Sequence, residues 1–90
     1  MRYYFDIFDG DHWTRDDFGV ELETDWRARH QAVLALCEMA REQLPGNGAA
    51  MDLTVRVRTG EGVVFTVRLD FSTEPGPALH DLAVGGAAAG

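Results

Sequence analysis

The fold is decided by residues 51–71, which read MDLTVRVRTGEGVVFTVRLDF. Leu53, Val55 and Val57 alternate with polar residues, which is the two-residue period of a strand with one buried face. A second alternating run follows, in which the residues expected to face inward are Val63, Phe65, Val67, Leu69 and Phe71. The glycines of the turn TGEG at residues 59–62 suit a hairpin. The stretch therefore predicts two antiparallel strands.

A helix is expected before this hairpin, from about residue 25 to residue 44. Thr24 suits the N-cap and Asp25 places an acid in the first turn, while Pro45 cannot continue the helix. Intervals of four and three residues place a set of residues in one apolar stripe, which we expect to cover the sheet. This stripe consists of Trp26, His30, Val33, Cys37, Ala40 and Leu44.

Further apolar residues lie beside that stripe, so the apolar arc spans more than half of the helix circumference. They are Ala28, Ala32, Ala35, Leu36 and Met39. A helix needs an apolar arc of only about 100° to cover a sheet, so this surplus is a candidate interaction surface and favours a homodimer. The alternative is that the alanines are there simply as good helix formers.

Two short strands are expected before the helix. Residues 3–8 alternate, and the turn at residues 9–11 leads into a second strand at residues 12–15. After a further turn at residues 16–19, residues 20–23 are extended and lead to the helix. The predicted fold is α+β, in the order strand-strand-helix-strand-strand, with one amphipathic helix on a mainly antiparallel sheet. Residues 1–72 form the single domain, and residues 73–90 are expected to be a flexible, low-complexity, disordered tail.

Composition excludes several classes of function. The 90 residues carry a net charge of −7, which disfavours nucleic acids and anionic membranes. The single cysteine allows no intrachain disulfide, and no apolar run approaches the roughly 20 residues of a membrane span. An acid at position 6 interrupts any signal-peptide core, so we expect a cytoplasmic protein.

No constellation of residues indicates catalysis, so we expect no enzyme, no metal and no cofactor. The acids around Asp9 do not follow a calcium-loop pattern, and the three histidines lack metal-ligand spacing. We interpret His30 as partly buried and Cys37 as a structural thiol on the apolar helix face. Ser72 has no evident base nearby.

The outward face of the predicted sheet brings aromatic and basic residues together. This outer sheet patch consists of Tyr4, Phe8, Arg56, Arg58 and Arg68. Such a set is found on RNA-binding sheets, but it is also typical of cross-strand Arg–Asp and Arg–aromatic pairs. The acidic net charge favours the second interpretation.

Residues 2–6 (RYYFD), the pair Asp9-Gly10 and residues 16–22 (DDFGVEL) resemble an uncharacterised family of short bacterial proteins, known only as a domain of unknown function. An alanine-rich helix and the Val/Arg alternation of residues 53–58 complete the resemblance, which covers roughly residues 2–69. The chain is more weakly similar to HicB-like antitoxin domains, although it lacks their proline-rich turn and their DNA-binding segment. The first resemblance implies fold and size, but no activity.

Three hypotheses of function follow. The first is a small non-catalytic protein-interaction or regulatory module, present as a homodimer. The second is an antitoxin-like module that binds a small basic toxin protein. The third is nucleic-acid binding through the outer sheet patch.

Overall fold

A computed structural model describes residues 1–46, 48 and 50–78. Three strands come first: β1 (Arg2–Phe8), β2 (Trp13–Thr14) and β3 (Val20–Glu21). The helix α1 (Asp25–Gln43) follows, with a 3-10 turn at Leu44–Gly46. The long hairpin of β4 (Ala50–Thr59) and β5 (Gly62–Ser72) completes the fold. The predicted α+β class is confirmed, and the extended residues before the helix contain a third short strand.

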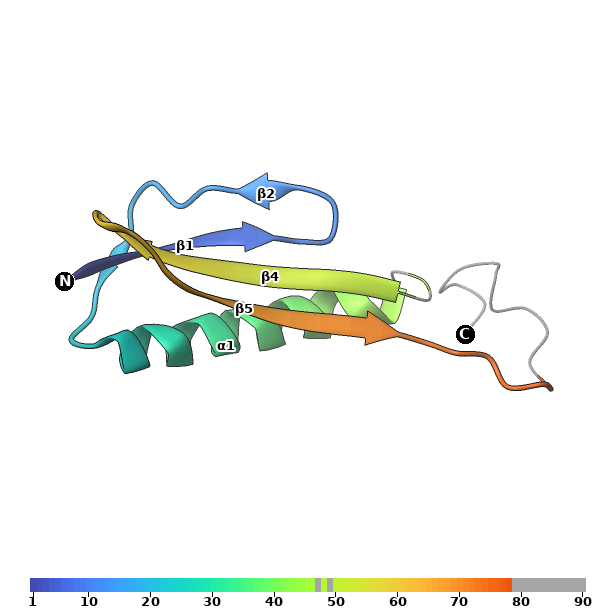
Figure 1. The fold of residues 1–90 in the computed structure, drawn as a ribbon. Helices are drawn as coiled ribbons and strands as arrows, with labels where there is room; N and C mark the ends of the chain where they lie inside the picture. Colours follow the sequence, from blue (N-terminus) through green and yellow to red (C-terminus); the bar gives the residue numbers. More distant parts are fainter. Residues whose placement is uncertain (47, 49, 79–90) are drawn as a thin grey trace.

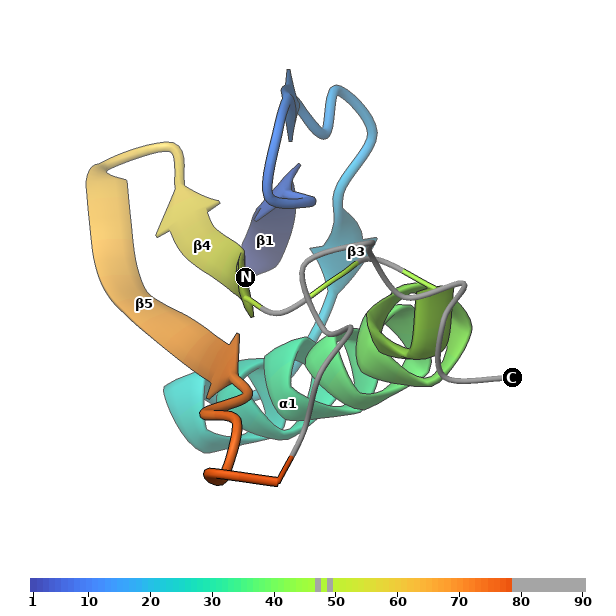
Figure 2. The same cartoon turned by 90° about the vertical axis from the view of Figure 1, so that its right-hand side faces the viewer.

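All strand pairs in the sheet are antiparallel, in the order β2-β1-β4-β5, and β3 pairs with β1 beside β2. α1 lies along one side of this sheet (Figures 1 and 2). Of the predicted tail, residues 73–78 follow β5 without helix or strand, and residues 79–90 lie outside the described residues.

The core forms between α1 and the inward face of β4. Leu53, Val55 and Val57 are fully buried, as the alternation predicts. Tyr3 of β1 joins them, and Phe5 packs against the cluster. Because β4 has a strand on each side and the helix beneath it, its apolar residues contribute most to burial.

The helix faces the sheet with a different side from the one expected. Ala28 and Ala32 are 0% exposed and Leu36 is 6% exposed, while Ala35 and Met39 pack partly buried against the core. These five residues were the candidate interaction surface, and the structure corrects that prediction, because they cover the sheet. The small side chains of Ala28 and Ala32, one turn apart, let the helix backbone approach β4 closely.

Half of the stripe expected to cover the sheet points to solvent instead, while Ala40 and Leu44 near its end pack partly buried against the core. Trp26 is 71% exposed, and its ring lies 4.9 Å from the Arg29 guanidinium. His30 and Cys37 are also exposed, so neither is a core residue. Both sides of this helix carry apolar residues, so periodicity alone does not determine which side faces the sheet.

The start of α1 is fixed by two side chains. Thr24 Oγ1 accepts a hydrogen bond from Arg27 N at 3.1 Å, which confirms the predicted N-cap. The Tyr3 hydroxyl donates to Asp25 Oδ1 at 2.6 Å. This bond, with burial, raises the pKa of Tyr3, and it joins β1 to the first turn of α1.

A bulge interrupts the hairpin near its turn. The register shifts between Val57 and Arg58, so Arg58 pairs with Val63 while Val57 pairs with Phe65. Val63 is consequently exposed, against the prediction that it faces inward. Residues 63–65 are all apolar, so the alternation pattern does not indicate which of them is the extra residue of the bulge.

Candidate functional site

The side of the sheet away from α1 carries an ion-paired network. Asp6 of β1 accepts hydrogen bonds from Arg58 of β4, at 2.8 Å from Nε and 3.3 Å from Nη2. Arg58 Nη2 also donates to the carbonyl oxygen of Asp16 at 2.7 Å. The Asp6 and Arg58 side chains are only 11% and 16% exposed. The network therefore holds β1, β4 and the loop before β3 together.

The charges in this network stabilise one another. Burial would raise the pKa of Asp6, but hydrogen bonds from Arg58 and from the Asp16 amide outweigh it and hold the pKa below its ordinary value of 3.8. The same pairing raises the pKa of Arg58. Both groups are therefore ionised at neutral pH, and each satisfies the other.

Asp16, in the loop between β2 and β3, accepts hydrogen bonds from backbone amides of this loop and of β1. Its Oδ2 accepts from the amide of Phe5 at 3.0 Å, at the part of β1 between the residues that pair with β3 and those that pair with β2. Its Oδ1 accepts from the amides of Phe18 and Gly19 at 2.9 and 3.0 Å. Burial acts to raise the pKa of Asp16, but these backbone hydrogen bonds lower it. The sequence predicts only a turn at residues 16–19. An aspartate that begins a turn often accepts hydrogen bonds from backbone amides shortly after it, and this tendency is the signal that could have indicated the role of Asp16.

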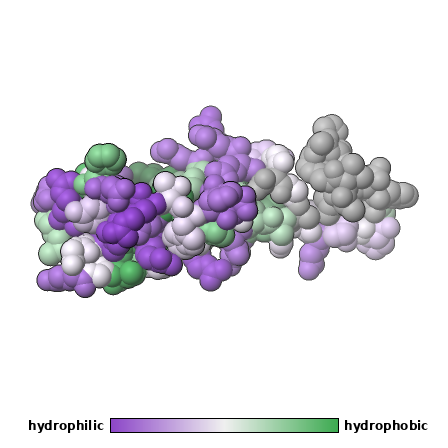
Figure 3. Space-filling view, turned by 90° about the horizontal axis from the view of Figure 1, so that it is seen from above, coloured by the Kyte–Doolittle hydropathy of each residue, from purple (hydrophilic) through white to green (hydrophobic). Residues whose placement is uncertain are grey.

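An aromatic ring lies against each of the two arginines of β4, Arg56 and Arg58. The Arg56 guanidinium lies 4.3 Å from the Trp13 ring centroid, and Trp13 contacts Phe8 with centroids 5.3 Å apart. Arg58 lies 4.6 Å from the Tyr4 ring centroid. Four members of the outer sheet patch are thus brought together, and Trp13, which is not a member of the predicted patch, joins them. Seen from the side away from α1, the surface is mostly hydrophilic, with a few hydrophobic residues between (Figure 3).

Arg68 lies apart from the other members of the patch, on β5. Its Nη2 is 3.5 Å from Asp70 and 3.8 Å from Asp52, and its side chain is 59% exposed. Asp52 and Asp70 are directly opposed on β4 and β5. The hydrogen bond with Asp70, together with burial and the charge of Asp70, raises the pKa of Asp52. Two acids therefore share one arginine at this end of the hairpin.

The groups with reactive side chains are scattered. His12 pairs with Asp11 at 3.2 Å in the exposed first turn. Within residues 1–46, 48 and 50–78, no group of three or more metal-ligating side chains comes together. Among the same residues, no helix has the length and apolar character to cross a membrane.

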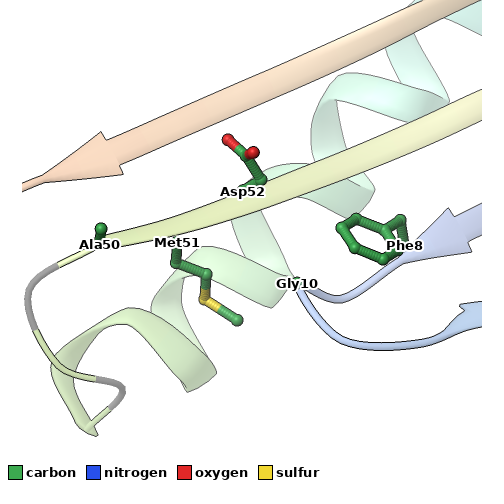
Figure 4. A pocket seen from close by; sticks show the side chains of 5 residues that line it. All are labelled: Phe8, Gly10, Ala50, Met51 and Asp52. Atoms are coloured by element: carbon green, nitrogen blue, oxygen red, sulfur yellow. The ribbon is translucent and has the colours of Figure 1, made fainter.

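One open hollow lies between the β1–β2 turn and the start of β4 (Figure 4). Phe8, Gly10, Ala50 and Met51 line it, and Asp52 is its single ionisable residue. Gly10 has a φ of +98°, and its backbone lies so close to Met51 that an added Cβ would sit 3.1 Å from that side chain. The lining itself therefore brings no two titratable groups together, since the neighbours of Asp52 are Asp70 and Arg68 of β5.

A more apolar groove runs between α1 and β5. Its lining is Arg29, Val33, Leu36, Cys37, Val67, Arg68 and Leu69. Val33, Val67 and Leu69 are half-buried, so the groove leaves apolar surface open to solvent. β5 borders it and stands at the end of the strand order. Among the described residues, β4 is the one strand that pairs with β5, so its other edge is free.

Comparison with known proteins gives one family. The sequence model of a family described as Domain of unknown function (DUF6894) matches residues 2–70. No curated protein matches the chain. No solved structure matches it either.

Proposed function

This chain belongs to the family described as Domain of unknown function (DUF6894), and we propose that it is a small, non-catalytic protein-interaction module that works as a homodimer. One observation carries the proposal. The half-exposed apolar groove between α1 and β5 lies directly beside a free strand edge. This combination offers a protein partner both main-chain hydrogen bonds and apolar contact.

The amount of apolar surface supports the proposal. Val33 and Cys37 on α1 stand one turn apart, on the side of the groove opposite Val67 and Leu69. Leu34 and Trp26 are exposed on the same helix. A domain of this size gains stability when a second subunit covers such surface, because small domains bury a modest fraction of their own.

The polar groups support a structural role for the opposite face. Asp6, Arg58 and Asp16 are engaged with one another, and Arg56 stacks on Trp13. Side chains that could have bound an anion or a base are thereby used to hold strands together. The protein contact is accordingly assigned to the groove and the free edge.

Light scattering after size exclusion tests this proposal. We expect the full chain to elute with twice the mass of one copy at micromolar concentration, and to dissociate on dilution. A single-copy mass up to the highest soluble concentration would refute the homodimer.

The net charge of −7 favours a second candidate, an antitoxin-like module that binds a small basic toxin protein. Exposed acids such as Asp11, Asp17 and Glu23 would attract a basic partner. A short, strongly basic reading frame beside this gene, whose product co-purifies in a salt-sensitive complex, would support the candidate. A neighbouring product that fails to bind at low salt would exclude it.

A further inference from the structure

The free edge of β5 can be assigned residue by residue. Phe5 of β1 donates its amide to Asp16, on the side away from β4, and Met1 and Leu22 exchange hydrogen bonds on that same side. Successive residues of a strand point their backbone groups to opposite edges. The backbone groups of the even-numbered residues of β1 therefore point to β4, where Tyr4 pairs with Arg58.

The same alternation continues across the hairpin. Since the backbone N–H and C=O groups of Arg58 and Arg56 point to β1, those of Val55 and Leu53 point to β5. Their partners on β5 are Val67 and Leu69. The remaining backbone groups of β5 point away from β4. These belong to Thr66, Arg68, Asp70 and Ser72.

We propose that a second copy of this chain pairs with this edge, β5 against β5, antiparallel about a two-fold axis at Leu69. The proposal rests on the proposed homodimer and gives its interface. In this register Arg68 lies opposite Asp70 of the second copy, and the same contact recurs on the other side of the axis. Thr66 lies opposite Ser72 of the second copy. Because the backbone groups of all these residues point to the free edge, each such pair exchanges two main-chain hydrogen bonds.

Charge favours this register over its neighbours, with the axis at Val67, Arg68 or Asp70. The side chains of directly opposed residues must lie on the same side of the sheet. The two-fold axis therefore lies where one residue of β5 faces its own equivalent in the second copy. An axis at Arg68 or at Asp70 would oppose like charges. An axis at Val67 would place Arg68 opposite Thr66 and leave Asp70 without a cation. The axis at Leu69 brings both charges into opposite-sign pairs.

The acid pair on the hairpin also favours a second copy. Asp52 and Asp70 face each other and share one exposed arginine. Like charges directly opposite on a sheet destabilise it. The second copy brings a further guanidinium to each of these acid pairs, so the repulsion that a single copy carries is relieved in the dimer.

The side of the sheet that carries α1 fits the same arrangement. The two-fold axis stands perpendicular to the sheet, so both helices lie on one face, either side of the joined strands. Val67 then lies opposite Phe71 of the second copy, and Leu69 lies opposite its own equivalent. These residues are half-buried in one copy, and the groove beside Val33 is covered as the two copies meet.

Charge reversal tests the register in the full-length chain. Arg68→Glu sets acids against acids across the axis, and Asp70→Arg sets arginines against arginines. Each variant alone should dimerise roughly tenfold or more weakly than wild type, because each change alters two cross-strand pairs. An equimolar mixture of the two variants should restore the dimer as a heterodimer, since each introduced charge then meets its opposite. Effects within one copy do not change on mixing, so restoration reports on the contact between copies.

Thr66→Pro tests the main-chain pairing, with Thr66→Ala as its control. The Thr66 amide points to the free edge, so proline removes no hydrogen bond to β4 but blocks pairing there. We expect a folded, monomeric Thr66→Pro variant and a dimeric Thr66→Ala variant. Charge variants that dimerise like wild type, or a mixture that stays monomeric, would overturn this interface and leave the homodimer itself standing. A monomeric wild type would overturn both.

Discussion

Replacing Asp6 by asparagine should remove much of the stability that joins β1 to β4. The substitution keeps the shape of the side chain but removes the charge that faces Arg58 at 2.8 Å. It also weakens the acceptor for the Asp16 amide at 2.9 Å. Exposed ion pairs contribute about 0–1 kcal/mol, whereas breaking a buried pair costs about 3–5 kcal/mol. With 11% of the Asp6 side chain exposed, we expect a loss of about 2–3 kcal/mol, between these two ranges and closer to the buried one.

Urea unfolding followed by circular dichroism measures this loss, at a fixed protein concentration because dimerisation adds to stability. A domain of this length should lose roughly 10–20 °C in Tm for the same change. Asp17→Asn is the matched control, since Asp17 makes an exposed pair with Arg15 at 3.4 Å. An Asp6→Asn variant within about 0.5 kcal/mol of wild type, like the control, would refute the network's role.

The pH dependence has a definite sign. The folded-state pKa values of Asp6 and Asp16 lie below the ordinary value of 3.8. Their contribution is therefore complete above that value, and it is lost as the pH falls through the lower folded-state pKa values. The stability difference between wild type and Asp6→Asn should consequently shrink as the pH falls below 3.8. A difference that stays constant down to pH 2 would show that the charge of Asp6 is not its cause.

Three further substitutions test the placement of individual residues, each by urea unfolding. Ala32→Gln forces a polar side chain into a fully buried position and should cost about 2 kcal/mol or more, whereas Leu34→Gln on the exposed side should change stability by less than about 0.5 kcal/mol; equal or reversed effects would contradict this orientation of α1. Gly19→Ala should cost about 2 kcal/mol or more, because Gly19 has a φ of +72° and a Cβ there would lie 2.9 Å from the Tyr3 carbonyl oxygen; an unchanged midpoint would contradict this turn geometry. Thr24→Ala should cost about 1 kcal/mol through loss of the N-cap, with Thr24→Ser close to wild type; a serine variant as weak as alanine would exclude the capping role.

The hairpin and the inward residues of β4 could be predicted from sequence, because alternation with a period of two has one physical interpretation. Leu53, Val55 and Val57 are all fully buried, as that pattern requires. The helix could also be predicted, but not its orientation. Both Ala28 and Trp26 lie on apolar arcs, and the choice between them depends on how closely the helix can approach β4, which is a property of the packed structure.

The outer network could be predicted only in part. Cross-strand pairing of arginines with acids and aromatics was one of the two interpretations of the outer sheet patch, and Arg58 pairs with Asp6 and Tyr4 in this way. Asp16 and Trp13 could not be placed, because their contacts depend on how the loop between β2 and β3 folds back along β1. The free edge of β5 likewise depends on strand order, which local patterns do not determine.

Amide hydrogen exchange along β5 tests most directly whether this edge is where two copies meet. In concentrated wild-type protein, the amides of Thr66, Arg68 and Asp70 should be protected, and this protection should disappear on dilution below the dissociation constant. The amides of Val67 and Leu69, which point to β4, should remain protected at both concentrations. Amides of the first set that exchange freely at every concentration, or that stay protected regardless of dilution, would contradict the account.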